Sequence, residues 1–411
     1  MSPKQAQQFK TYGYRWAILT VYALINAVMQ IQWLTFAPIA REAQKAYAAT
    51  PMEIDLLSMV FMLIFLVMCI PASYILDRYG LRKGVGVGAV LVGVFGLMKG
   101  VFAGSYTMVF IAQVGLAVAQ PFIMNSATKV AVHWFPINER ATAVGVATLS
   151  QFLGMIVVMI ATPLMITQVG ATYDLGGMLL AWGAVSALGA LALVVFLREY
   201  PPTPAGPESG EDRLLTAEGL KRIFRHRDML LAILMFFIGL GIFNAVATCI
   251  DQVSEIKGFT MEQSGMIMGL MLIAGIFGAV IFPPMSDHMR KRKPLLVLGT
   301  VLLTPGLLGL AIAGSYEIML ATSALVGAFL LGTAGPIGFQ YVAEVSYPAP
   351  ESLSQGIVLL AGQISGIIFI VLMNTVGMIE SLYIFAGLAA LTIIITLLMK
   401  ESPRILTDTQ K

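Results

Sequence analysis

Twelve apolar segments of about 20 residues or more constrain this sequence more than any other feature. A helix of that length crosses the hydrocarbon core of a bilayer and satisfies its backbone hydrogen bonds internally. The sequence therefore predicts an all-α membrane protein with about twelve transmembrane helices. The expected spans lie at about 14–38, 54–76, 84–104, 107–133, 141–166, 173–197, 229–254, 262–283, 294–313, 317–342, 352–376 and 379–399.

The composition agrees with a membrane protein and argues against several other classes. Of 411 residues, 58% are hydrophobic and 11% are charged, whereas soluble domains contain about 25% charged residues. The formal net charge of +3 is too small to indicate nucleic-acid binding. Cys69 and Cys249 both lie in apolar segments, so no disulfide, metal site or cofactor is predicted. The polar N-terminus leads directly into a long span, which argues against a cleavable signal peptide.

A long polar stretch from Arg198 to Asp228 divides the apolar segments into two sets of six. It contains four prolines, and its piece from Leu214 to Arg225 is compatible with a surface helix. We therefore predict an N-terminal six-helix bundle at 1–198, a cytoplasmic linker at 199–228 and a C-terminal six-helix bundle at 229–411.

Basic residues are distributed unevenly between the two expected membrane faces. Twenty of the 25 Lys and Arg residues lie on the face that holds both termini and the linker. Because cytoplasmic loops carry the excess of basic residues, both termini are predicted to be cytoplasmic, in a plasma or inner membrane. The five exceptions are Arg41, Lys45 and Lys257 on the opposite face and Lys99 and Lys129 within spans.

The two sets of six segments carry matching residues at a nearly constant spacing. Coincidence does not explain a colinear series that crosses two loop regions, so an internal repeat is indicated. The matches are Phe135 with Tyr347, Pro136 with Pro348, Glu139 with Glu351, Gln151 with Gln363 and Gly154 with Gly366 at a spacing of 212, and Thr50 with Thr260 and Asp77 with Asp287 at 210.

The loop between the second and third segments reads Asp77-Arg78-Tyr79-Gly80-Leu81-Arg82-Lys83. It resembles the signature loop of the major facilitator superfamily, and Asp287 begins a degenerate copy in the second half. Parallel six-helix repeats are typical of that superfamily. The resemblance implies the major facilitator fold, with two pseudo-symmetric six-helix bundles and a substrate site at the bilayer midplane between them.

Several charged residues are candidates for a gate. The loop carboxylates can cap a following helix or pair with a neighbouring basic group and latch the cytoplasmic side; the alternative is that the loop residues only set topology. Lys129 and Glu344 lie inside spans near their cytoplasmic ends, where pairing with Glu139 or Arg140 favours a structural or gating role over substrate binding. The predicted gating residues are Asp77, Arg78, Arg82, Lys129, Glu139, Arg140, Asp287 and Glu344.

Asp251 is the deepest acidic residue of the seventh span and is expected in its outer third. It is either an extracellular gate that attracts cations or a residue at the outer boundary of the membrane. No carboxylate is expected at mid-depth, which argues against a dedicated proton-coupling site.

Amide side chains near the middle of several spans are the candidate substrate ligands. Such groups are costly in a bilayer unless they face a cavity or another helix, so the alternative is a role in holding helices together. Trp33 and Phe243 are expected to add aromatic walls that attract an ammonium group. The amides are Asn26, Gln30, Gln120, Gln151, Asn244 and Gln363.

Short motifs over most of the chain match a narrower group of sequences; they lie at 26–32, 57–63, 76–82, 119–123, 241–248, 251–252, 343–348 and 362–369. In these segments the sequence resembles the feline leukaemia virus subgroup C receptor-related transporters. The resemblance implies a carrier whose relatives transport choline, ethanolamine or, by older assignment, haem, and in one branch a pyridoxine-like substrate.

The family's substrate-site glutamines match Gln120 and Gln363. Its aromatic residues are replaced in part, because Gln30 stands where the best-known members have a tryptophan and Asn244 aligns with their tyrosine. Trp33 lies one helical turn from Gln30 and can compensate.

We therefore predict a secondary transporter of a small organic solute that works by alternating access, with an amine or organic cation as the leading substrate class. The alternatives are a carrier of a neutral or anionic metabolite and a non-transporting receptor or sensor on the same fold. An enzyme is not predicted, because no histidine cluster and no Ser/His/Asp grouping at one depth is present. The expected partners are a small-molecule substrate and membrane lipid, with no nucleic acid and a monomeric state.

Overall fold

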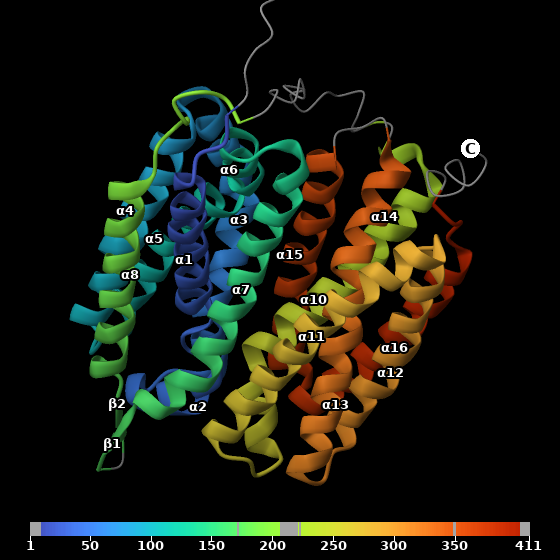
Figure 1. Cartoon of the computed structure of the whole chain (residues 1–411). Helices are drawn as coiled ribbons and strands as arrows, with labels where there is room; N and C mark the ends of the chain where they lie inside the picture. Colours follow the sequence, from blue (N-terminus) through green and yellow to red (C-terminus); the bar gives the residue numbers. More distant parts are fainter. Residues whose placement is uncertain (1–9, 171, 206–220, 222, 348–350, 403–411) are drawn as a thin grey trace, which may run out of the picture. The chain divides into compact units, whose positions relative to one another are not determined.

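The computed structural model describes residues 10–170, 172–205, 221, 223–347 and 351–402 (Figure 1). Within these residues, twelve helices are long and apolar enough to cross a membrane, which confirms the expected number of spans. The elements before the linker are α1 (Tyr14–Leu34), the 3-10 turn η1 (Ala37–Ile39), α2 (Ala40–Tyr47), α3 (Pro51–Tyr79), α4 (Leu81–Val101), α5 (Tyr106–Met124), α6 (Ala127–Trp134), α7 (Ile137–Met165), β1 (Thr167–Val169), β2 (Thr172–Asp174) and α8 (Gly176–Phe196).

The second half follows the same plan of long apolar helices. Its elements are α10 (Arg227–Ile256), α11 (Met261–Met289), α12 (Lys293–Ile312), α13 (Tyr316–Phe329), the π-turn η2 (Leu330–Ala334), α14 (Pro336–Ser346), α15 (Glu351–Val376) and α16 (Met378–Leu398).

Two segments differ from the expected spans. The first span continues through η1 and α2 to Tyr47 instead of ending near residue 38. The hairpin β1–β2 occupies the expected start of the sixth span, so α8 begins at Gly176, whose N–H donates to the Asp174 carboxylate at 2.8 Å. The expected surface helix at Leu214–Arg225 and most of the linker lie outside the described residues.

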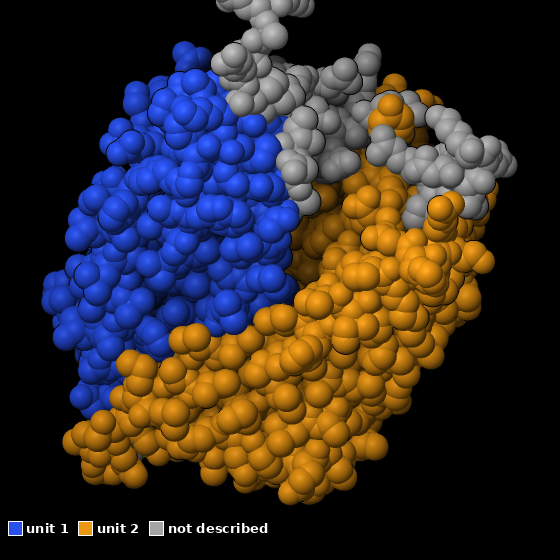
Figure 2. Space-filling model, viewed as in Figure 1, with its two compact units in different colours: residues 1–33, 67–155, 174–212 blue, residues 34–66, 156–173, 213–411 orange. Residues whose placement is uncertain are grey.

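The chain forms two compact units, coloured separately in Figure 2. Unit 1 comprises residues 1–33, 67–155 and 174–212, and unit 2 comprises residues 34–66, 156–173 and 213–411. Unit 2 therefore includes parts of α3 and α7 from the N-terminal half of the sequence. The two units are defined by spatial contacts and not by the order of the sequence. They do not test the domain bounds expected from the sequence, which stay a prediction.

Helix packing in the two units repeats the same pairings. In unit 1, α4 packs against α5 and α8, the fourth and sixth spans of the first half. In unit 2, α12 packs against α13 and α16, the fourth and sixth spans of the second half. The third span of each half thus contacts equivalent neighbours, in agreement with the internal repeat.

The fourth span of each half is interrupted. In the first half, α5 ends at Met124 and α6 begins at Ala127. In the second half, α13 passes into the π-turn η2, and α14 begins at Pro336, which has no N–H to continue the hydrogen-bond ladder. Each fourth span therefore consists of a longer first segment and a shorter second segment.

A repeated glycine permits one close helix crossing in each unit. A Cβ atom on Gly154 of α7 would lie 2.2 Å from the Ala27 carbonyl oxygen of α1. A Cβ atom on Gly366 of α15 would lie 2.9 Å from the Met62 sulfur and 3.0 Å from Asn244 of α10. Small residues allow such close contact between membrane helices. The spacing of 212 residues between the two glycines therefore reflects a shared packing requirement.

We predict that Gly154→Ala lowers the thermal unfolding temperature of the detergent-solubilised protein, because the new methyl group overlaps backbone atoms that cannot move aside. The expected loss is about 1–3 kcal/mol. Gly145→Ala is the matched control on the same helix, where an added Cβ meets nothing within 4 Å. An equal effect of both substitutions would contradict a specific role for the Gly154 crossing.

Candidate functional site

Three of the predicted amides form a hydrogen-bonded network in unit 1. Gln151 of α7 donates from Nε2 to Asn26 Oδ1 of α1 at 3.4 Å. Gln30, one turn further along α1, donates to Gln151 Oε1 at 3.5 Å. Asn26 also donates to the Tyr22 carbonyl oxygen of its own helix at 2.9 Å. The network joins α1 to α7 and explains how these amides are accommodated among apolar residues.

One atom of this network has no partner. Gln30 is 2% exposed, and its Oε1 accepts no hydrogen bond from the described residues. Trp33 lies three residues along α1, on the same helical face, and is buried. Gln120 is buried on α5, one residue before the helix-internal Pro121. The arrangement leaves an amide acceptor next to an aromatic side chain on one helix.

The candidates in unit 2 occupy two contacting helices. Phe243 and Asn244 are both buried on α10, which packs against α15. Asn244 donates to the Gly362 carbonyl oxygen at 3.3 Å. Gln363, the next residue of α15, is half-buried. Asn244 thus serves at least partly to hold α10 against α15, and a ligand role for Gln363 stays a prediction.

The charged residues within the fourth spans form ion pairs, but not with the expected partners. Lys129 pairs with Asp77 at 2.5 Å and donates to the Leu76 carbonyl oxygen at 2.9 Å. The expected partner of Lys129, Glu139, instead pairs with Arg15 at 3.0 Å. The expected pairing of Lys129 with Glu139 is therefore wrong, because Arg15 at the start of α1 supplies the partner of Glu139 and Asp77 at the end of α3 supplies the partner of Lys129.

The equivalent group in unit 2 is centred on Arg292. Its guanidinium pairs with Glu344 of α14 at 3.1 Å and with Asp287 at the end of α11 at 2.5 Å. Burial acts to lower the pKa of Arg292, but the hydrogen bonds and charges of the two carboxylates outweigh it and raise that pKa. Arg140, the other expected partner of Glu344, donates instead to the carbonyl oxygens of Phe135 and Val132.

The loop arginines of the first half have more limited contacts. Arg78 donates to the Tyr74 hydroxyl at 3.2 Å, and its side chain is exposed. Arg82 is exposed and contributes its backbone N–H to the Glu199 carboxylate at 2.6 Å. A gating role for either arginine stays a prediction.

Two capping glutamates were missed in the sequence. Glu199, just after α8, accepts from the first backbone N–H groups of α4 at 2.7 and 2.6 Å. Glu401, just after α16, accepts from the first N–H groups of α12 at 2.8 and 3.2 Å. A carboxylate at a helix N-terminus satisfies free donors and the helix dipole. The signal was a basic residue followed by glutamate after the sixth span of each half, Arg198-Glu199 and Lys400-Glu401.

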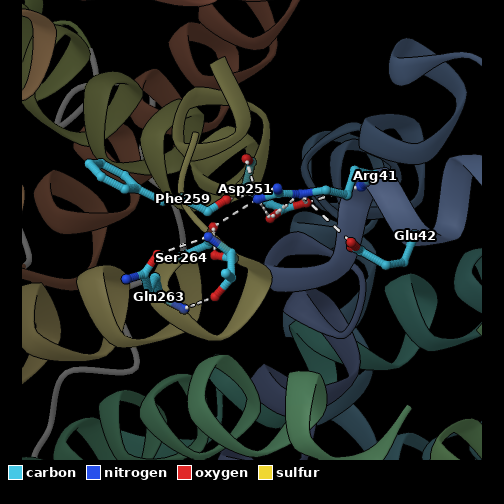
Figure 3. Close-up of polar contacts among 7 residues, drawn as sticks. Arg41, Glu42, Asp251, Phe259, Gln263 and Ser264 are labelled. Atoms are coloured by element: carbon cyan, nitrogen blue, oxygen red, sulfur yellow. Dashed lines mark hydrogen bonds and ion pairs between the residues drawn. The ribbon is translucent and has the colours of Figure 1, made fainter. Parts of the chain in front are cut away.

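Asp251 belongs to a buried ion pair, which Figure 3 shows. Arg41 of α2 donates to both Asp251 carboxylate oxygens, the shortest contact being 2.6 Å from Nη2. The same guanidinium donates to the Phe259 carbonyl oxygen and the Ser264 hydroxyl, and lies 3.8 Å from Glu42. Asp251 is fully buried in unit 2, and its role as an extracellular gate or as a residue at the outer boundary of the membrane stays a prediction. We call Arg41, Glu42 and Asp251 the Asp251 cluster.

A second buried acid was missed. Asp55 of α3 accepts hydrogen bonds from Gln252, Asn374 and Cys249 at 2.7, 2.7 and 3.4 Å. Its only sequence signal was a carboxylate four residues into an apolar helix. Lys99 was likewise treated only as an exception to the charge distribution, although it is fully buried and donates to Gln113 at 3.3 Å.

Comparison with known proteins decides the family. The model of the Major Facilitator Superfamily matches residues 19–370 and 250–410. The chain belongs to this superfamily. Its fold agrees with solved members: a bacterial homologue of the human lysosomal transporter Spinster covers 97% of this chain and 99% of its own, with TM-score 0.78 and 14% identity. A D-xylose–proton symporter covers 95% and 99%, with TM-score 0.75 and 13% identity.

The relatives support the narrower resemblance. Solute carrier family 49 member A3 of Danio rerio is 26% identical over 90% of this chain and 80% of its own length. The choline/ethanolamine transporter FLVCR2 of Homo sapiens is 24% identical over 89% of this chain and 73% of its own length. The chain is therefore a multi-pass membrane transporter related to the feline leukaemia virus subgroup C receptor-related family.

We predict that Glu344→Gln destabilises the protein by about 3–5 kcal/mol, because it leaves the largely buried Arg292 without its enclosed counter-charge. Asp287→Asn is the matched control, since Asp287 contacts the same guanidinium but its side chain is 66% exposed. The control is expected to cost about 1 kcal/mol or less. Thermal unfolding in detergent measures both, and equal losses would contradict the distinction.

Proposed function

We propose that this protein is a carrier of a small organic amine or organic cation. The observation that carries the proposal is the unpartnered Oε1 of Gln30, held in place by the amide network beside Trp33. A buried acceptor without a donor costs about 1–3 kcal/mol. A hydroxyl or primary ammonium group of a ligand would supply that donor, and the aromatic face of Trp33 would attract the positive charge.

The relatives support the same substrate class. Several are named choline/ethanolamine transporters, at 24–27% identity to this chain. Choline carries a hydroxyl group and a quaternary ammonium, and ethanolamine carries a hydroxyl group and a primary ammonium. Both therefore offer a donor for Gln30 and a charge for an aromatic partner.

The contacts near the two signature-loop copies favour a carrier over a non-transporting receptor. Lys129 with Asp77 and Arg292 with Glu344 provide comparable ion pairs in the two halves. A carrier needs interactions at this end that break and re-form during alternating access. A receptor that no longer moves has no such requirement.

The proposed location is the cytoplasmic or plasma membrane, with both termini on the cytoplasmic side. The support is the concentration of Lys and Arg on one face, because this bias sets the orientation of membrane proteins. In this orientation α2 and the hairpin β1–β2 face the outside of the cell. A carrier of a neutral or anionic metabolite is the alternative that uptake measurements would reveal.

The sequence also predicts that Gln120 and Gln363 hold the same solute. We expect Gln120→Ala and Gln363→Ala each to weaken choline or ethanolamine binding about ten- to a hundredfold, because a hydrogen bond in a low-dielectric site is lost. The double substitution should cost less than the sum, since the two residues would share one ligand. Binding to purified protein and uptake into proteoliposomes measure these effects.

The matched control is Gln168→Ala, on the exposed hairpin strand β1, which should leave affinity unchanged. Trp33→Ala should weaken binding of choline more than binding of its uncharged carbon isostere. If the two glutamine variants fold and bind with wild-type affinity, these residues only hold helices together. If no amine binds the wild-type protein, the proposed substrate class is wrong.

A further inference from the structure

The Asp55 carboxyl is enclosed in unit 2 among neutral donors. It is 2% exposed and accepts from the side-chain amides of Gln252 and Asn374 at 2.7 Å and from the Cys249 thiol at 3.4 Å. These partners belong to α10 and α15, whereas Asp55 belongs to α3. Among the described residues, Asp55 forms no ion pair. The site thus surrounds an acid with hydrogen-bond donors but supplies no positive charge.

The neighbouring charges do not neutralise Asp55. On α10, Asp251 precedes Gln252 and is already paired with Arg41 of α2. Glu42 is also buried, lies 3.8 Å from Arg41, and its Oε2 has no hydrogen-bond partner in the described part of the chain. Of the three enclosed carboxyl groups, only those of Asp251 and Glu42 lie within 4 Å of a guanidinium in the described part of the chain. The remaining charged groups, Lys45 of α2 and Glu255 of α10, are exposed.

An enclosed negative charge without a cationic partner is costly, and such a group lowers the cost by binding a proton. Asp251 is directly paired and Glu42 lies near Arg41, so among the described residues Asp55 is the one of these three acids without a cationic partner. We propose that Asp55 is a proton-binding site of this transporter. The proposal goes beyond the proposed amine transport and does not depend on it.

The site can accommodate the proton without rearranging the helices. Gln252 donates from Nε2, while its Oε1 has no hydrogen-bond partner among the described residues. Rotation of the Gln252 side-chain amide by about 180° about its Cγ–Cδ bond would let Oε1 accept a hydrogen bond from the protonated Asp55 carboxyl. The reaction is the addition of one proton to a carboxylate, with no other bond formed or broken. The proton comes from water on the side to which the site opens.

Protonation is coupled to the contacts between the sequence halves. Asp55 comes from the N-terminal half, and Gln252 and Asn374 come from the C-terminal half. Separating α3 from α10 and α15 would expose Asp55 to water, where the ionised carboxylate is stable. The closed arrangement therefore binds the proton more tightly than the open one. By linkage, falling pH stabilises the closed arrangement and rising pH favours opening.

The native Cys249 reports this opening directly. The chain contains two cysteines, so Cys69→Ser leaves Cys249 as the single thiol, and Cys249 is fully buried. We expect its labelling by a hydrophilic maleimide, in the full-length protein, to rise about tenfold between about pH 5 and pH 8. Rates are divided by those of the unfolded protein at each pH, because thiol reactivity itself depends on pH. Ionised Asp55 would disfavour the Cys249 thiolate. Its charge alone would therefore slow the labelling as the pH rises, which is opposite to the change expected from opening.

Two variants on the Cys69→Ser background test the assignment. Asp55→Asn, which is nearly isosteric, should abolish the normalised pH dependence, whereas Glu42→Gln should retain it. Thermal unfolding identifies any variant that has lost its fold. If Asp55→Asn does not fold, Asp55→Glu is used in its place and should shift the pH at which the labelling rate reaches half of its change. A pH dependence that persists in Asp55→Asn, or disappears only in Glu42→Gln, would overturn the proposal.

A comparison with and without sodium distinguishes proton binding from the binding of a metal cation. At fixed pH, replacing sodium chloride by N-methylglucamine chloride should leave the labelling rate of the Cys69→Ser protein unchanged. If sodium slows the labelling and this effect requires Asp55, the site binds Na⁺ and the assignment of a proton is wrong.

Discussion

A polar group enclosed among membrane helices cannot turn to water, so the buried charged and amide side chains take their partners from within the protein. The fully buried Asp251 is neutralised by the partly buried Arg41, and Arg292 is enclosed with Glu344. Where a buried polar group lacks such a partner, the missing partner points to a function. Among the described residues, Gln30 Oε1 has no donor and Asp55 has no cationic partner, and these two departures carry the functional proposals.

The same physical solution recurs in both halves of the chain. Gly154 of α7 lets the backbone of α1 approach closely, and its counterpart Gly366 of α15 leaves room for the side chains of Met62 and Asn244. A glutamate after the sixth span caps the third span in each half, through Glu199 and Glu401. Gly154 and Gly366 are one of the residue pairs that match at a spacing of 212. Elsewhere, any apolar side chain of suitable size satisfies the packing, so the repeat is hard to detect.

The twelve spans and the superfamily could be predicted from the sequence because hydrophobic length and one loop motif determine them. The ion-pair partners could not, since Lys129 and Glu139 are ten residues apart but pair with Asp77 and Arg15. Spacing along the chain does not reveal which neighbouring helix supplies a charge. Asp55 was missed for the same reason, because its donors Gln252 and Asn374 lie about 200 and 320 residues away in the sequence.

The interruption of each fourth span places an ion-pairing side chain on a short separate helix. Lys129 stands on α6 and Glu344 on α14, in both cases beyond the break that follows the longer segment. α6 has 8 residues and α14 has 11, so each ion-pairing side chain lies on a helix of about two to three turns. In the proposed gate, α6 and α14 would pivot at these breaks to separate the charges, while the first segments would keep their contacts. The part that moves would then be much shorter than the helix that crosses the membrane.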